Sequence, residues 1–207
     1  MREGERRQGG LAAGQRRAER LERLLDAGLQ LFGTDGYART SVEGLCARAG
    51  VSSRRFEEHF SGCEDVLEAV YDAIIVDVTA RVVAATAAAP LTVEDQTRAG
   101  LEAFVTHLLA DTRRARVVLI EVVGVSPRLE RRRRDVIRAF AAQAEGSRRR
   151  LIEAGVLPDR PLGRAAIMLV GAVNELLVDC MYRDERPGTA TLVDETTRLW
   201  VAAALAS

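Results

Sequence analysis

The sequence predicts an all-α protein of about nine helices, with an N-terminal three-helix domain and a larger C-terminal helical domain. Apolar side chains recur at spacings of three and four along most of the chain, which places them on one face of a helix. Breaks at Gly and Pro are each followed by a residue that can begin the next helix. The loops at these breaks are short enough for neighbouring helices to pack antiparallel.

Three parts of the chain differ in composition. Residues 1–15 hold four glycines and three arginines with almost no apolar periodicity, so we expect a mobile basic arm there. Residues 16–61 contain the short helices, and residues 62–207 contain the longer ones. The sequence therefore predicts two folded domains after a short arm.

The first helix is expected to begin near Arg17, where leucines spaced three and four apart start to form one apolar stripe. Gly33 and Gly36 are expected to end it. Thr40 and Glu43 then match a capping box, in which the Thr hydroxyl accepts from the Glu43 N–H and the carboxylate reaches back. This pair predicts the start of a second, short helix.

A tight turn with glycine at its centre, Ala49–Val51, predicts the end of the second helix and the start of a third. The third short helix is expected over Ser52–Phe60, with its first serine as the cap. Ser61–Glu64 matches another capping box. It predicts a long helix over residues 62–88.

The valine-rich residues 117–123 form the only stretch in which a strand competes with a helix. The preceding arginines and the flanking helical pattern favour a buried helix there. The remaining helices are expected to start at Thr92, at Ser126 with Pro127 in the first turn, at Pro161, and at Thr191 with Asp194.

The second and third short helices, with the small-residue turn between them, suit a helix-turn-helix, because its two helices cross steeply over three or four residues. The third helix would then lie in the major groove of DNA and present its first residues to the bases. Arginine offers a planar fork for guanine, and serine can donate to phosphate or to a base. The residues that would do so here are Ser52, Ser53, Arg54 and Arg55.

Residues 21–70 resemble the DNA-binding domain of the tetracycline-repressor (TetR) family. The matching pieces, in order and at the family's spacing, are LLDAGLQLFGTDGY, TSVEGL, ARAGVSSRRF, HF and CEDVL. The rest of the chain resembles the family in its helical pattern, including VGAVNELL, which is similar to the dimerisation helix. The resemblance implies a dimeric, all-helical regulator of double-stranded DNA, commonly a repressor released by a small ligand. Residues 16–61 would bind DNA, and residues 62–207 would bind the ligand and dimerise.

The resemblance implies contacts with DNA at Thr40, Ser41, Ser52, Ser53, Arg54, Arg55 and His59. The first two would meet phosphate, and the histidine would lie near the DNA backbone. Two positions depart from the family: Glu57 stands where tyrosine is usual, and Cys63 where lysine is usual. A carboxylate repels phosphate, and a lost lysine removes about one released counterion. We expect the two arginines and the basic arm to compensate.

Two C-terminal segments, residues 162–182 and 190–205, each carry an apolar face. We expect them to pair with their symmetry mates in a four-helix interface, because an isologous dimer suits a palindromic operator. The residues assigned to this interface are Ile167, Val170, Val173, Leu177, Met181, Leu192, Leu199 and Ala203.

An effector pocket between the middle helices would be mainly apolar, with a few polar groups that orient the ligand. Glu121 and Asn174 each interrupt an apolar run and are the candidate polar contacts. The candidate walls are Phe104, His107, Phe140 and Met168. We therefore expect a small, mainly apolar effector, and no cofactor.

Composition argues against several other classes. The formal net charge is zero, so any nucleic-acid site is a local patch. Three cysteines without a CxxC pair are typical of reduced thiols in a cytoplasmic protein, and two scattered histidines give no metal site. No Walker loop, GxSxG or dinucleotide turn suggests an enzyme. Residues 165–182 are too short and too polar for a membrane span, so no membrane partner is expected.

Two other functions are compatible with the sequence. The chain could be a helical interaction protein with a degenerate helix-turn-helix that no longer binds DNA, which Glu57 and Cys63 favour. It could also be a small-molecule binding bundle without regulatory output. A DNA-binding measurement separates the regulator from both.

Overall fold

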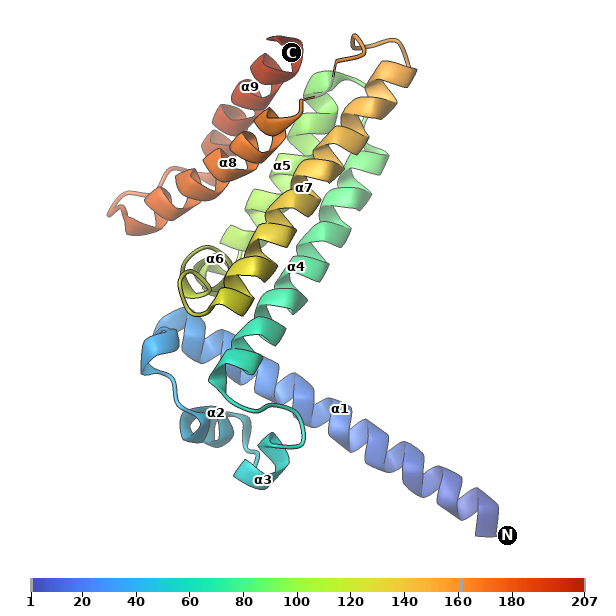
Figure 1. The fold of residues 1–207 in the computed structure, drawn as a ribbon, viewed down its shortest axis with the longest axis vertical. Coiled ribbons are helices and arrows are strands. Elements are labelled where there is room, and N and C mark those ends of the chain that lie inside the picture. The colour runs from blue at the N-terminus through green and yellow to red at the C-terminus, as the bar shows by residue number, and fades with distance from the viewer. Residues whose placement is uncertain (1, 161, 207) are drawn as a thin grey trace. The chain divides into compact units, whose positions relative to one another are not determined.

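The computed structural model describes residues 2–160 and 162–206, and it divides into two compact units. One unit ends at Asp72 and the other begins at Ala73, within one long helix. All regular elements in the described residues are helices, so the predicted all-α class is confirmed (Figure 1). The boundary that the sequence predicts, between residues 61 and 62, lies just before that long helix.

Nine α-helices are found in the described residues. They are α1 (Arg2–Thr34), α2 (Val42–Ala49), α3 (Ser53–Phe56), α4 (Cys63–Ala88), α5 (Val93–Leu109), α6 (Thr112–Arg116), α7 (Pro127–Glu153), α8 (Arg164–Tyr182) and α9 (Thr189–Ala206). A 3-10 turn, η1, spans Tyr37–Arg39, and a π-helical stretch, η2, spans Val117–Glu121.

The core of the first unit is built from apolar side chains of α1, α2, α3 and the start of α4. Its fully buried members include Leu24, Phe32, Leu45, Phe56, Val66 and Leu67. Burying one such side chain stabilises the fold by about 1.5–3 kcal/mol. Gly28 allows α1 to approach α4 closely, because a Cβ there would lie 2.9 Å from both Val66 Cγ1 and Val70 Cγ2. The apolar stripe predicted for the first helix is the face on which this unit packs.

The first helix begins earlier than the sequence predicts, at Arg2 rather than near Arg17. Residues 2–16 contain Ala, Glu, Gln and Arg, whose helix propensity is high, but also four glycines, so local propensity alone does not explain the earlier start. The side chains of residues 2–13 lie outside the described part of the structure. The mobile basic arm over residues 1–15 therefore stays a prediction.

The capping box predicted for the second helix is shifted by one residue. Ser41, not Thr40, is the N-cap of α2, and its Oγ accepts the Gly44 N–H at 3.1 Å. The Thr40 hydroxyl instead donates to the Gly36 carbonyl oxygen at 2.9 Å. Both residue types can cap a helix, so the pattern alone did not determine which of the two adjacent residues does so.

In the second unit, α9 packs along α5 and α8 packs along α7 (Figure 1). Residues 117–123 are helical over most of their length, and Val117, Val118 and Val122 are buried. The buried helix predicted for this valine-rich stretch is therefore confirmed. Its π-helical backbone was not expected.

Two of the helix starts predicted for the second unit are confirmed, whereas α9 begins at Thr189, two residues before the predicted start at Thr191. Thr92 and Ser126 each accept a hydrogen bond from the backbone N–H three residues on, at 3.0 and 3.2 Å, and cap α5 and α7. Pro127 occupies the first turn of α7, as predicted. Pro161 lies outside the described residues, and the helix expected there begins at Arg164.

The α8 helix is unusual in its combination of apolarity and exposure. The sequence prediction that residues 165–182 are too short and too polar for a membrane span is wrong by this measure: α8 is the one helix of the described residues long and apolar enough to cross a membrane, with a mean hydropathy of 1.6. Only 28% of that stretch is buried in the fold. One such helix is weak evidence for a membrane span, and an exposed apolar face equally suits contact with another protein chain.

Candidate DNA-binding surface and candidate effector cavity

The turn between α2 and α3 depends on one glycine. Gly50 has a φ of 62°, in the left-handed region that glycine adopts without strain. This conformation ends α2 and lets the Val51 N–H reach the Cys46 carbonyl oxygen at 3.0 Å. The chain then reverses, and Phe56 of α3 is buried in the core of the unit.

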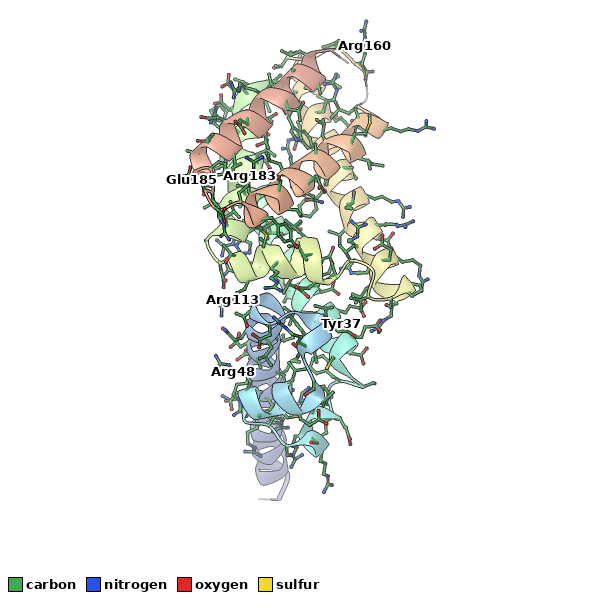
Figure 2. The ribbon with its side chains drawn as sticks, turned by 90° about the vertical axis from the view of Figure 1, so that its left-hand side faces the viewer. Tyr37, Arg48, Arg113, Arg160, Arg183 and Glu185 are labelled. Carbon is green, nitrogen blue, oxygen red and sulfur yellow. The ribbon has the colours of Figure 1, made fainter. Side chains whose placement is uncertain are left out.

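The first residues of α3 are exposed together. Ser52, Ser53, Arg54 and Arg55 all face solvent, and Ser52 is the N-cap without a side-chain hydrogen bond. This is the arrangement that the sequence predicts for a helix that presents its N-terminal residues to a groove. Arg48, which Figure 2 labels, is also exposed near the end of α2. The surface carries positive charge where the sequence places the DNA contacts.

One carboxylate lies within this positive surface. Glu58 pairs with Arg55 at 2.6 Å and with Arg20 of α1 at 3.5 Å. Arg17 also donates to the Glu58 carbonyl oxygen at 3.1 Å. The hydrogen bond from Arg55 holds the pKa of the Glu58 carboxyl below its usual value, so it is charged at neutral pH. Glu57, the carboxylate that departs from the family pattern, is exposed, and the role of its neighbour Glu58 was not predicted from the sequence.

His59, which the resemblance places near the DNA backbone, is partly enclosed by its own unit. Its ring is half-buried, with its centroid 6.3 Å from that of Phe60, and its Nε2 has no hydrogen-bond partner in the described structure. Burial, and then the charges of Arg17 and Arg20, lower the pKa of His59. The ring is therefore neutral at neutral pH and offers no full positive charge to a phosphate.

Cys63 occupies the position where the family usually has lysine. Its thiol donates to the Thr40 carbonyl oxygen at 3.6 Å, and burial raises the pKa of the thiol. The side chain therefore ties the start of α4 to the segment before α2. It adds no charge to the surface.

A partly enclosed cavity of about 130 Å³ lies within the second unit. Side chains from α4, α5, α7, α8 and α9 line it, and most of them are apolar. Phe104 and Phe140 meet edge to face on one wall, with centroids 5.4 Å apart and ring planes at 77°. Other apolar lining residues are Val82, Leu101, Val170, Val173 and Trp200.

Two polar residues of the cavity wall are nearly inaccessible to solvent. Gln96 donates to the carbonyl oxygens of Thr86, Ala89 and Pro90, at 2.9, 3.0 and 3.2 Å, and so closes the loop between α4 and α5. Arg148 of α7 is 3% exposed, and its Nε donates to the carbonyl oxygen of Arg160, a residue labelled in Figure 2. Neither residue was predicted from the sequence to line the cavity.

Comparison with known proteins identifies the first unit. Residues 24–70 match the family model described as bacterial regulatory proteins, tetR family. The helix-turn-helix unit is therefore similar to the N-terminal domain of that family. A search of curated proteins found no match to the sequence.

Solved structures share the TetR-type fold over most of the chain. FadR from Bacillus halodurans, a fatty acid degradation regulator, has a TM-score of 0.79 at 19% identity and covers 88% of this chain and 94% of its own. FadR from Bacillus subtilis, solved with stearoyl-CoA, has a TM-score of 0.78 at 16% identity, with coverages of 88% and 98%. The TetR-family regulator PfmR from Thermus thermophilus has a TM-score of 0.66 at 20% identity, with coverages of 87% and 97%. At these identities the likeness shows the fold alone.

The TetR-type second unit brings only some of the predicted effector contacts together. Phe104, Phe140 and Asn174 line the cavity. Glu121 instead pairs with Arg116 at 2.8 Å. Met168 is 66% exposed, on the outer face of α8. An interrupted apolar run identifies a buried helix, but it does not say which side of the helix meets the cavity.

His107 is the remaining predicted wall residue, and it lies outside the cavity lining. Its ring is buried, with Nε2 3.4 Å from a carboxylate oxygen of Asp77 on α4. Burial, and then Arg114, lower the pKa of His107. The ring therefore packs as a neutral side chain between α4 and α5.

The interface predicted for α8 and α9 needs a correction. Val170, Val173, Leu177 and Leu192 are buried within the unit, and the first two line the cavity. Ile167 and Leu199 are 45% and 48% exposed and remain available for contact with another chain. A helix can bury one face in its own core and expose an adjacent apolar face, which the apolar pattern did not separate.

Proposed function

We propose that this TetR-type chain is a ligand-responsive transcriptional regulator that binds a palindromic operator as a homodimer. It acts in the cytoplasm as a repressor and leaves double-stranded DNA when a small effector binds. Its role is regulatory rather than catalytic. The observation that carries the proposal is the exposed start of α3, Ser52–Arg55, which follows the Gly50 turn in a TetR-family domain.

The exposed apolar face of α8 supports the proposal that the chain forms a homodimer. Met168 and Tyr182 on this helix are 66% and 73% exposed, and Leu199 on α9 is 48% exposed. Apolar side chains of this size are unfavourable in water, and an isologous contact between two copies would cover them. Two symmetry-related recognition helices would then match the two halves of a palindrome.

The mainly apolar cavity supports the proposal that a small effector binds this chain. It lies in the unit that follows the DNA-binding domain, and few polar groups line it. Bacillus subtilis FadR, which has the same fold, was solved with stearoyl-CoA. An apolar effector in this cavity could favour one arrangement of a dimer over another and so change its affinity for DNA.

A second candidate function is an interaction protein that has lost DNA binding. The observation in its favour is the pair of adjacent carboxylates, Glu57 and Glu58, at the end of α3. Both would repel phosphate, and the Glu58 carboxylate already forms an ion pair with Arg55. We favour the regulator because Ser52, Ser53 and Arg54 remain exposed beside them.

A mobility-shift assay tests the proposal directly. The probes are the DNA upstream of the chain's own gene and a scrambled duplex of equal length, at several salt concentrations. A regulator binds the first probe more tightly than the second. Equal, weak binding of both would favour the interaction protein. Tight DNA binding that no effector changes would refute ligand control and leave a constitutive DNA-binding protein.

A further inference from the structure

Two buried hydrogen-bond donors on the cavity wall lack partners in the described structure. Arg148 uses Nε and Nη1 to donate to the carbonyl oxygens of Arg160 and Ala204, at 2.5 and 2.8 Å. Its Nη2 is buried and has no partner. The Nε1 of Trp200 is also buried without a partner. Buried polar atoms are nearly always satisfied, so each of these two requires an explanation.

The two donors belong to one region of the cavity. Trp200 and Ala204 are one turn apart on α9, and the Ala204 carbonyl oxygen binds the Arg148 guanidinium. Both Arg148 and Trp200 line the cavity. Arginine and the indole nitrogen can only donate, so a matching ligand must supply acceptors.

The charge of Arg148 also lacks a counterion. No Asp or Glu occurs among the described residues that line the cavity, and Arg148 is the only charged residue among them. The two carbonyl oxygens offset part of this charge, but a buried cation without an anion is costly. The structural bonds of Arg148 therefore account for two of its nitrogens and leave the third, with the charge, for a ligand.

The size and the wall chemistry restrict the ligand further. The cavity volume of about 130 Å³ is close to the roughly 150 Å³ engineered cavity that binds benzene. The apolar part of the lining includes Phe104, Phe140 and Leu101. A compact hydrocarbon body with one anionic end fits this combination. A full stearoyl chain would require the cavity to enlarge.

We infer that the effector is a compact apolar monocarboxylate whose carboxylate accepts hydrogen bonds from Arg148 Nη2 and Trp200 Nε1. This inference rests on the proposed function, since it names the chemical class of its effector. A carboxylate is planar, carries one charge and offers several acceptor sites to convergent donors. The hydrocarbon part occupies the space between the two phenylalanine rings and α8.

Matched pairs of probes test the inference on the wild-type protein. The pairs are benzoate with benzamide and octanoate with octanamide, so each pair differs in charge and little in shape. Trp200 is the only tryptophan of the chain, and its fluorescence reports on the cavity directly. Calorimetry gives the affinities. We expect at least one carboxylate to bind about 10- to 150-fold more tightly than its amide, the factor for a hydrogen bond to a charged group.

Variants then locate the carboxylate. Arg148→Met should abolish the preference for the acid and leave weak binding of the amide. Arg149→Met is the matched control, because Arg149 is the exposed neighbour on the same helix. Arg148→Lys keeps the charge and should retain part of the preference. If Arg148→Met does not fold, the ratio of acid to amide affinity in the wild-type protein and in Arg148→Lys still tests the inference.

Three outcomes would overturn the inference: no carboxylate binds, the amides bind as well as the acids, or Arg149→Met removes the preference as fully as Arg148→Met. Mobility shifts without ligand are measured in parallel. DNA binding that only a neutral apolar ligand changes would leave the proposed function standing and reject the carboxylate. Carboxylate binding without any binding to DNA would support the carboxylate effector site and reject the proposed function as a DNA-binding regulator.

Discussion

The Arg55 guanidinium of α3 lies 2.6 Å from the carboxylate of Glu58, which stands three residues further along the chain, in the turn that follows this helix. The arginine that the sequence assigns to DNA is therefore already engaged in the free protein. Both side chains are substantially exposed, so the pair itself is weak and sensitive to salt. DNA must compete with Glu58 for this guanidinium and must also approach its negative charge.

Replacing Glu58 is expected to strengthen DNA binding. Glu58→Gln removes the competing charge, releases Arg55 and should raise affinity for all duplexes by up to about fivefold, the factor for an exposed ion pair. The measurement is a fluorescence-anisotropy titration at low and high salt. Glu22→Gln on α1 removes the same charge at another exposed position and serves as the control. An equal gain in both variants would mean that only net charge matters.

Replacing Arg55 should weaken recognition of the operator selectively. If Arg55 grips a guanine, Arg55→Ala costs about 1–3 kcal/mol on the operator and relaxes the preference at one base pair. Competition binding with single-base operator variants measures both effects. Loss of the same factor on operator and random DNA would reduce Arg55 to a phosphate contact.

Because α1 approaches α4 closely at Gly28, a larger residue there is expected to lower stability. Gly28→Ala would place a Cβ 2.9 Å from two valine methyl groups of α4, and repacking should cost about 1–3 kcal/mol of unfolding free energy. Gly14→Ala on the same helix meets nothing within 4 Å, and higher helix propensity should leave stability unchanged or raise it by up to about 1 kcal/mol. Urea denaturation compares the two. A neutral Gly28→Ala would show that α1 and α4 can separate without loss.

The buried His107 predicts a loss of stability in acid. Burial and Arg114 lower the pKa of this histidine in the folded protein, whereas the unperturbed value is 6.5, and Asp77 opposes the shift. The unfolded chain therefore takes up the proton first, so stability is complete above pH 6.5 and falls as the pH decreases toward the folded value. His107→Gln should reduce the difference in Tm between about pH 7.5 and about pH 5.5. An unchanged difference would assign the acid sensitivity to other groups, with His59 the first to examine.

A charge on the exposed face of α8 is expected to disrupt the dimer. Met168 is 66% exposed, so Met168→Arg leaves the fold intact and puts two unpaired charges into the proposed interface. Analytical ultracentrifugation should show a shift from dimer to monomer. Val83→Arg, at a position 50% exposed on α4, is the control and should remain dimeric. A persistent dimer in Met168→Arg would move the interface away from this face.

The sequence alone determined the elements that depend on neighbouring residues. Caps at Thr92 and Ser126, the glycine turn at Gly50 and the helical periodicity are local, because each requires only a few adjacent side chains and the backbone between them. For the same reason the residue pattern was enough to place the arginines at the start of α3. The choice between Thr40 and Ser41 as a cap shows the limit of this reasoning, since two adjacent residues offered the same chemistry.

Only the tertiary structure decided what each helix face meets. It turned Val173 toward the cavity and left Met168 outside, although both lie on one apolar helix. It also brought Arg148 of α7 beside Ala204 of α9, a contact between residues 56 positions apart. Such a pairing depends on how helices pack against one another, and no local pattern records it. The sequence therefore determined which helices form, and their packing decided which side chains build the cavity.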